Sequence, residues 1–171
     1  MEIEIRHAIP DDYHGIHLLF SQPKACSDTL QLPYSSPELW RKRLENVPNN
    51  SVSLVACVEN EIVGSIVLFV IDRMRRRHVG TIGMGVHDAW QNQGVGTKLL
   101  DAVLDLADNW YNLIRVELTV FVDNEAAIHL YKQVGFQVEG MLKKYAFRNG
   151  EFVDSYGMGR IRTPDGCAPD A

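Results

Sequence analysis

A glycine-containing loop joins a strand pattern to a long amphipathic helix pattern in the middle of this chain, and this junction constrains the fold most. Residues 79–86 alternate apolar side chains with small ones, which predicts a strand. From Val95 to Trp110, apolar residues recur every three or four positions, which predicts one helix of about four turns. Gly94 and Gly96 lie where this helix begins, and free N–H groups beside glycines at a helix N-terminus bind phosphate oxygens. A tight strand-to-helix turn explains the two glycines equally well, so the loop alone leaves anion binding open.

The rest of the chain also mixes strand and helix patterns. Strands are expected over residues 2–7, 52–58, 62–71, 116–122, 136–147 and 152–160, the last two forming a hairpin about Asn149-Gly150. Helices are expected over residues 10–20 and 38–46 and after a cap at Asp123-Asn124, the last helix ending at Gly135. Residues 21–37 contain several prolines and little apolar periodicity, so we expect a loop there. This order predicts an α/β fold in which helices cover a mixed sheet.

Length, charge and cysteine content limit the classes of protein to which this chain can belong. Its 171 residues predict a single domain over residues 1–162, followed by a mobile tail over residues 163–171. A formal net charge of -5 argues against binding to nucleic acids or anionic membranes. The sequence has neither an apolar run that could span a bilayer nor a signal-peptide pattern, so we expect a cytoplasmic protein. Its three cysteines are far apart and form no ligand pattern, so we expect no metal site.

Two segments resemble the conserved blocks of one enzyme superfamily. Residues 86–96, which include Gln91, Gly94 and Gly96, resemble the acetyl-CoA signature of the GNAT N-acetyltransferases, Gln/Arg-x-x-Gly-x-Gly/Ala after a strand. Residues 120–136 are similar to a second GNAT pattern of strand, asparagine, helix, tyrosine and Gly-Phe. The resemblance implies the GNAT (acyl-CoA N-acyltransferase) fold, a mixed, mostly antiparallel sheet of about seven strands with four helices on both faces. It also implies an acetyl-CoA-dependent N-acetyltransferase that forms a homodimer.

The same resemblance assigns cofactor contacts to particular residues. It implies that the backbone of Met84, Gly85 and Val86 pairs with the pantetheine arm of acetyl-CoA. It implies that the pyrophosphate is held by the loop residues Gln91, Asn92, Gln93, Gly94, Val95, Gly96 and Thr97. Asn124 matches the family's asparagine that contacts the pantetheine, although an asparagine there also suits a plain helix cap.

Tyr131 is the candidate catalytic acid. It matches the tyrosine that in many GNAT enzymes donates a proton to the departing CoA thiolate after the amine has attacked the thioester in a ternary complex. The alternative is a core tyrosine whose hydroxyl is bonded to the backbone.

The general base is less clearly indicated. Many relatives carry a carboxylate on the strand before the signature, whereas residues 79–86 contain no ionisable side chain. Glu117 alternates onto the opposite face from its apolar neighbours and is a candidate to accept the amine proton through water. The alternatives are a structural role for Glu117, a weaker base at His78, or a chain of water molecules with no single base.

The acceptor is suggested by a closer likeness within the superfamily. Residues 29–33, 117–124, 143–146 and 148–151 resemble segments of bacterial amino-acid N-acetyltransferases that act on phenylalanine and methionine. This likeness implies acetylation of the α-amine of an apolar L-amino acid, with substrate contacts from Thr29, Leu30, Gln31 and Leu32. Tyr145, Phe147 and Phe152 are candidates for apolar pocket walls, although core packing explains them equally well.

Other functions fit the same pattern. The acceptor is alternatively a protein N-terminus of the ribosomal-protein type, a polyamine or an amine-bearing antibiotic. A non-catalytic acetyl-CoA sensor is a further alternative, against which the presence of both Asn124 and Tyr131 argues. The arginines between Asp72 and His78 indicate a solvated turn rather than a nucleic-acid site, because an aspartate precedes them and the chain is acidic.

Overall fold

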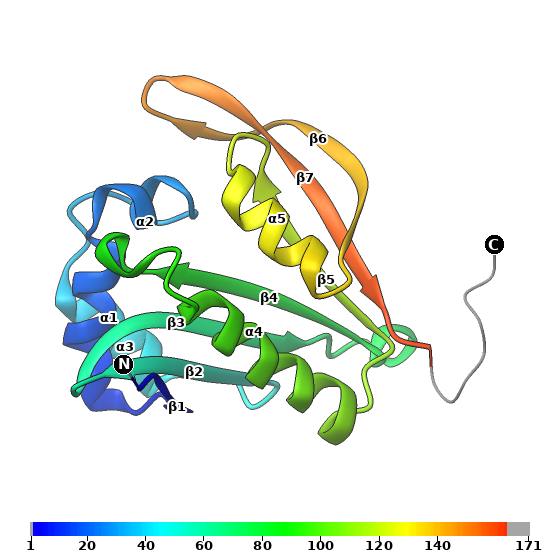
Figure 1. Cartoon of the computed structure of the whole chain (residues 1–171), viewed down its shortest axis with the longest axis horizontal. Helices are drawn as coiled ribbons and strands as arrows, with labels where there is room; N and C mark the ends of the chain where they lie inside the picture. The colour runs from blue at the N-terminus through cyan, green and yellow to red at the C-terminus, as the bar shows by residue number, and fades with distance from the viewer. Residues whose placement is uncertain (1, 164–171) are drawn as a thin grey trace. The chain divides into compact units, whose positions relative to one another are not determined.

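Seven strands form one hydrogen-bonded sheet in the computed structural model, which describes residues 2–163 (Figure 1). The strands are β1 (Glu4–His7), β2 (Ser51–Val58), β3 (Glu61–Val70), β4 (Val79–Val86), β5 (Arg115–Phe121), β6 (Gln137–Arg148) and β7 (Glu151–Ile161). Their order in the sheet is β1-β2-β3-β4-β5-β7-β6. The β4–β5 pair is parallel, whereas β1–β2, β5–β7 and β6–β7 are antiparallel, so the predicted mixed sheet is confirmed.

Within the described residues, five α-helices accompany the sheet. They are α1 (Tyr13–Phe20), α2 (Pro23–Ser27), α3 (Pro37–Glu45), α4 (Val95–Asp105) and α5 (Glu125–Gln133). Short 3₁₀-helices cover Pro10–Asp12 (η1), Met74–Arg76 (η2) and Asp88–Trp90 (η3), and a π-helical turn covers Leu106–Trp110 (η4). The expected tail falls almost entirely outside the described residues, and the expectation of a single domain stays a prediction.

Helix α2 corrects the expectation of a loop over residues 21–37. Pro23 occupies the first turn of α2, where a missing N–H costs nothing. The N–H groups of Lys24 and Ala25 donate to the carboxylate of Asp88, with N–O distances of 2.9 Å each. Because this cap comes from a residue more than sixty positions away, local periodicity could not reveal the helix.

The end of the long central helix also differs from the expectation. Val95, Leu99 and Val103 are buried as predicted, but Trp110 is 77% exposed. The N–H of Tyr111 donates to the carbonyl of Leu106, a π-type bond that fits an extra residue into the last turn. The wider turn rotates Trp110 out of the apolar stripe in which the three- and four-residue spacing placed it.

The chain divides into two compact units, each with its own core. Unit 1 comprises residues 1–68 and 83–103. Its helices α1, α2 and α3 share a buried cluster with β2, in which the rings of Phe20 and Trp40 stack at 4.9 Å. Five consecutive residues of β2, Leu54–Val58, are buried, so both faces of this strand are covered.

Unit 2 comprises residues 69–82 and 104–171 and holds β5, β6, β7 and α5. Alternate residues of β5 are buried, namely Val116, Leu118 and Val120, so one face of this strand belongs to the core. The β6–β7 hairpin turns at Asn149 and Gly150, whose φ angles are 51° and 83°. Two consecutive positive φ angles define the turn type that favours Asn-Gly, and the predicted hairpin is confirmed.

Candidate active site

The loop between β4 and α4 in unit 1 presents a row of backbone donors. The first bond inside α4 runs from the N–H of Lys98 to the carbonyl of Gly94, so the N–H groups before Lys98 have no acceptor within the helix. Gly94 has a φ of +85°, and a Cβ built there would meet nothing within 4 Å. Val95 is 1% exposed, so its buried side chain fixes the loop to the core. An exposed, glycine-lined helix start of this kind has the chemistry to bind phosphate oxygens.

Strand β4 carries the residues expected to meet the pantetheine. Gly85 has no room for a side chain, because a Cβ there would lie 2.4 Å from Cε1 of Phe20. The side-chain amide of Gln91 approaches the carbonyl of Val86 at 3.5 Å, which ties the loop to the strand end. The contacts of Met84, Gly85 and Val86 with a cofactor stay predictions.

Helix α2 adds a cation beside this loop that the sequence did not indicate. Nζ of Lys24 donates to Oε1 of Gln91 at 2.7 Å. Asp88 caps the same helix and lies three residues before Gln91. Lys24 and Asp88 were both missed, because each acts through a partner that is distant in the sequence.

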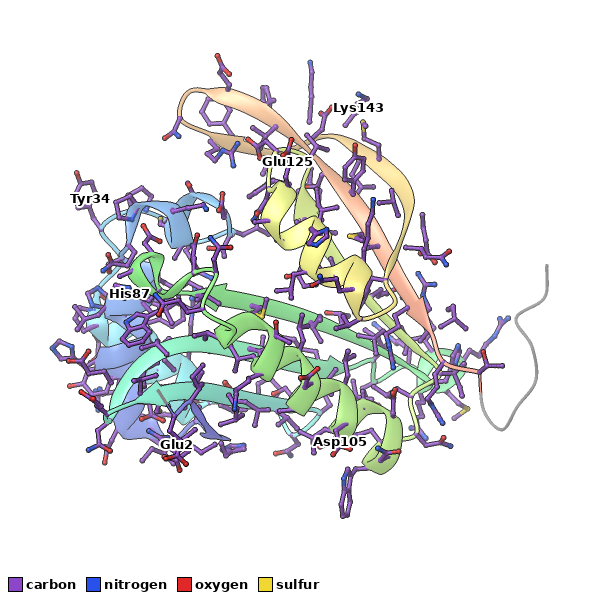
Figure 2. The ribbon with its side chains drawn as sticks, viewed as in Figure 1. Glu2, Tyr34, His87, Asp105, Glu125 and Lys143 are labelled. Atoms are coloured by element: carbon purple, nitrogen blue, oxygen red, sulfur yellow. The ribbon has the colours of Figure 1, made fainter. Side chains whose placement is uncertain are left out.

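The segment expected to contact substrate follows α2 directly. Thr29 donates through its hydroxyl to the carbonyl of Ala25 at 2.8 Å, and Oε1 of Gln31 accepts from Arg43 at 2.9 Å. Leu30 and Leu32 are 64% and 77% exposed. Tyr34 is fully exposed and projects away from the chain (Figure 2). The segment is therefore fixed by polar contacts while its apolar side chains are available to a ligand.

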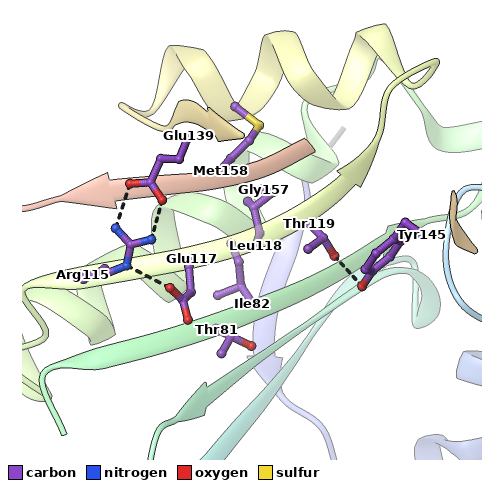
Figure 3. Close-up of a pocket in the computed structure, with 10 residues that line it drawn as sticks. All are labelled: Thr81, Ile82, Arg115, Glu117, Leu118, Thr119, Glu139, Tyr145, Gly157 and Met158. Carbon is purple, nitrogen blue, oxygen red and sulfur yellow. Dashed lines mark hydrogen bonds and ion pairs between the residues drawn. The ribbon is translucent and has the colours of Figure 1, made fainter. Parts of the chain in front are cut away.

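A pocket of about 400 Å³ opens in unit 2 near the point where β4 and β5 stop pairing (Figure 3). These two strands pair only from Val79–Arg115 to Thr81–Glu117. The lining residues come from β4, β5, β6 and β7: Thr81, Ile82, Arg115, Glu117, Leu118, Thr119, Glu139, Tyr145, Gly157 and Met158. The volume lies within the range of small-molecule sites, about 300–1,000 Å³.

A chain of ion pairs forms one wall of this pocket (Figure 3). Glu117 accepts from Arg76 at 2.6 Å through one oxygen and from Nε of Arg115 at 2.8 Å through the other. Arg115 also donates to both oxygens of Glu139, at 2.8 and 2.5 Å. Partial burial raises the pKa of Glu117, but the hydrogen bonds from the two arginines outweigh it and hold that pKa below its usual range. The hydrogen bonds from Arg115 likewise lower the pKa of Glu139.

Tyr145 forms part of the opposite wall. Its hydroxyl lies 3.1 Å from the hydroxyl of Thr119, and its ring contacts Phe121 edge to face. Of the three aromatic residues considered as pocket walls, only Tyr145 lines the pocket. Phe147 and Phe152 are more than 60% exposed and pack against each other, at a centroid distance of 5.1 Å.

Helix α5 carries the other two residues indicated by the second sequence block. Oδ1 of Asn124 accepts from the N–H of Ala127 at 3.2 Å and so caps the helix, while its amide nitrogen has no partner among the described residues. Tyr131 is 7% exposed, and burial raises its pKa to about 12. Burial alone accounts for this pKa, with no contribution from a hydrogen bond to the hydroxyl, which argues against the alternative of a hydroxyl bonded to the backbone. Tyr131 therefore stays protonated at neutral pH, and its O–H group is available to donate a hydrogen bond or a proton.

A model of the Acetyltransferase (GNAT) family matches residues 17–136. The chain belongs to this family. It is therefore an acetyl-CoA-dependent N-acetyltransferase, which confirms the expectation from the two sequence blocks. The GNAT fold of the mixed seven-stranded sheet is confirmed as well, with α2 as a helix beyond the expected four.

Individual relatives of this GNAT chain differ in their acceptors. The chain is 45% identical over 161 residues to the L-amino acid N-acetyltransferase AaaT of Escherichia coli strain K12, covering 94% of this chain and 99% of that protein. A spermidine N-acetyltransferase from Vibrio cholerae, solved in complex with CoA and spermine, is 26% identical with a TM-score of 0.80, covering 93% and 95% of the two chains. A ribosomal-protein-alanine N-acetyltransferase from Brucella melitensis, at 22% identity and a TM-score of 0.82 over 93% and 99%, shares the fold.

In residues 2–163, no group of three or more His, Cys, Asp or Glu side chains is arranged to hold a metal ion. No helix in that range has both the length and the apolar character needed to cross a bilayer. The expectation that no metal takes part stays a prediction.

Proposed function

We propose that this enzyme moves the acetyl group of acetyl-CoA to the α-amine of an apolar L-amino acid. The observation that carries the proposal is the 45% identity to an L-amino acid N-acetyltransferase, which extends over nearly the whole of both chains. The pocket of unit 2 supports it, because a charged wall faces a wall that includes an aromatic ring. An amino acid carries a charged head and an apolar side chain, and these require such a combination of walls.

The donor is proposed to bind through residues 84–97 and Asn124. The exposed start of α4 fits a pyrophosphate, since its N–H groups before Lys98 lack acceptors within the helix. Lys24, beside Gln91, adds a positive charge to the same loop. Asn124 retains an amide nitrogen for the pantetheine while its oxygen caps α5. Bound acetyl-CoA supplies a thioester carbonyl that an amine attacks directly.

Tyr131 is proposed to protonate the departing thiolate. Its pKa of about 12 keeps the hydroxyl proton in place at neutral pH, and no described residue competes for that proton. A positioned general acid contributes about 10² to 10⁴-fold to such a step. Two features support this role, a retained proton and a hydroxyl without a described partner.

Glu117 is proposed to accept the amine proton through water. Both of its oxygens are engaged by arginines, which keeps it ionised but makes it a weaker base than an unpaired carboxylate. Glu139 also binds Arg115, so a comparison of variants at Glu117 and Glu139 separates a role as base from a purely structural role.

The pocket favours an amino acid over a polyamine. A polycation binds best where carboxylates are in excess. Here Glu117 and Glu139 are both paired with Arg115, and Arg76 adds a second positive charge. The wall is therefore close to neutral, which suits a zwitterion.

We also propose that the enzyme is a homodimer located in the cytoplasm. Light scattering on the purified protein tests the dimer.

Thiol release from acetyl-CoA, with mass detection of the products, tests the acceptor. The panel comprises the natural amino acids, spermidine, a peptide with an N-terminal alanine and kanamycin. We expect the highest turnover with large apolar amino acids and little with spermidine, the peptide or kanamycin. Turnover confined to the peptide, spermidine or kanamycin would show that this amine, and not an amino acid, is the acceptor. Tight acetyl-CoA binding without any turnover would indicate a sensor.

A further inference from the structure

Gly157 is the only glycine among the ten residues that line the pocket. It lies in β7, opposite Thr119 of β5 and Gly140 of β6. A Cβ built on Gly157 meets no atom within 4 Å, and its φ lies outside the positive range that favours glycine. Neither the backbone conformation nor a neighbouring atom therefore requires glycine at this position.

Gly159 provides the contrast. It lies two residues further along β7, on the same face of the strand. A Cβ on Gly159 would lie 2.5 Å from Oε1 of Glu139, the carboxylate that holds Arg115. Packing thus explains why Gly159 lacks a side chain, whereas it leaves Gly157 unexplained. The space above Gly157 is part of the pocket itself.

We propose that Gly157 determines how large an acceptor side chain the pocket admits, because a residue without a side chain leaves this part of the pocket empty. The inference rests on the proposed function, because it assigns this pocket to the amino-acid acceptor. Figure 3 shows Gly157 between the charged group of Arg115 and Glu139 and the pair formed by Thr119 and Tyr145. A side chain at position 157 would project between these two walls and occupy the room that a large acceptor needs.

The variants Gly157→Ala and Gly157→Val test this inference. We expect kcat/KM for leucine, methionine and phenylalanine to fall in the order wild type, alanine variant, valine variant, by about 10- to 200-fold in the last. Turnover of the small acceptors glycine and alanine should change little, as should the KM for acetyl-CoA. Valine suits a strand and has open space here, so both variants should fold, which thermal unfolding verifies.

Gly140→Val is the matched control. Gly140 faces Gly157 across the β6–β7 pair and also has open space around its Cβ position, but it does not line the pocket. This variant should keep the wild-type preference for large acceptors. The inference is overturned if Gly157→Val lowers turnover of small and large amino acids equally, or if Gly140→Val changes the preference as strongly. A wild-type enzyme that acetylates no amino acid would instead refute the proposed function, and the inference with it.

Discussion

The backbone N–H of Lys24 donates to the carboxylate of Asp88 at 2.9 Å, although the two residues are 64 positions apart. The other oxygen of Asp88 accepts from Ala25, and the side chain of Lys24 reaches Gln91. Helix α2 is thus fixed at its start by a residue that precedes the loop at α4. The segment 29–32 follows α2 and bonds back to it through Thr29. Asp88 therefore connects the proposed cofactor loop with the proposed substrate segment.

Asp88→Ala should remove the link between helix α2 and the loop at the start of α4. Two capping bonds are lost, and the loss of a cap costs about 0.5–2 kcal/mol of the free energy of unfolding. We also expect the KM for the amine to rise, because α2 no longer holds the segment 29–32. Urea unfolding and steady-state kinetics measure the two effects.

Ser36→Ala is the control for Asp88→Ala. Ser36 caps α3 by accepting from the N–H of Leu39 at 3.2 Å, so this variant also removes a cap but leaves Asp88 intact. It should lower stability without raising the KM for the amine. Equal changes in KM for both variants would show that Asp88 acts only through stability.

Tyr131→Phe should abolish most turnover while preserving the fold. Because the hydroxyl has no described partner, its removal leaves no other group unsatisfied, and we expect unchanged thermal stability and acetyl-CoA affinity. The value of kcat should fall by about 10² to 10⁴-fold. With a pKa of about 12, the tyrosine loses its proton only at high pH, so the wild-type profile should show no decline from this group below about pH 10. Wild-type turnover in the variant would remove the proposed acid.

Local patterns predicted most of the elements in this chain. Strand β4 has the predicted limits, and the turn at Asn149-Gly150 forms because these residues tolerate positive φ angles. Helix α5 begins after Asn124, as its capping preference indicated. Each of these features depends on residues that are close together in the sequence.

Features that depend on distant partners were not predictable in the same way. Helix α2 needs Asp88, and the low pKa of Glu117 needs Arg76, which lies 41 positions away. Sequence alternation placed Glu117 opposite its apolar neighbours but could not show which groups would meet it. The unengaged hydroxyl of Tyr131 was likewise unpredictable, since it depends on all the residues that surround the ring.

Glu117→Gln tests the proposed route of the amine proton. The amide keeps the shape of the side chain but cannot take up a proton, so kcat should fall by about 10²-fold or more. Glu139→Gln is the matched comparison, because it removes the other carboxylate bound to Arg115 and leaves Glu117 in place. We expect a clearly smaller loss of kcat in this second variant. Equal losses would show that the ion-pair chain only maintains the pocket, and His78 or a chain of water molecules would then be the remaining candidates for the base.

Asp12→Asn should lower stability in a manner that depends on pH. Asp12 is 8% exposed and accepts from both terminal nitrogens of Arg6 at 2.8 Å and from the N–H of Ile9 at 2.8 Å. Burial alone would raise the pKa of Asp12, but the hydrogen bonds from Arg6 and Ile9 hold it below its usual range. At neutral pH we expect a loss of about 1–2 kcal/mol, which allows for the solvent that reaches Arg6.

The pH dependence of this loss follows from the direction of the shift. A carboxyl whose pKa is lower in the folded state than in the unfolded state adds stability above the unfolded value of about 3.9 and loses it as the pH falls through the folded value. The difference between wild type and Asp12→Asn should therefore stay constant from about pH 8 to pH 5 and shrink below about pH 4. Glu38→Gln, which breaks the exposed pair with Arg41, should cause a much smaller loss throughout. A difference for Asp12→Asn that already shrinks near neutral pH in urea unfolding would mean that Asp12 is not held ionised by Arg6.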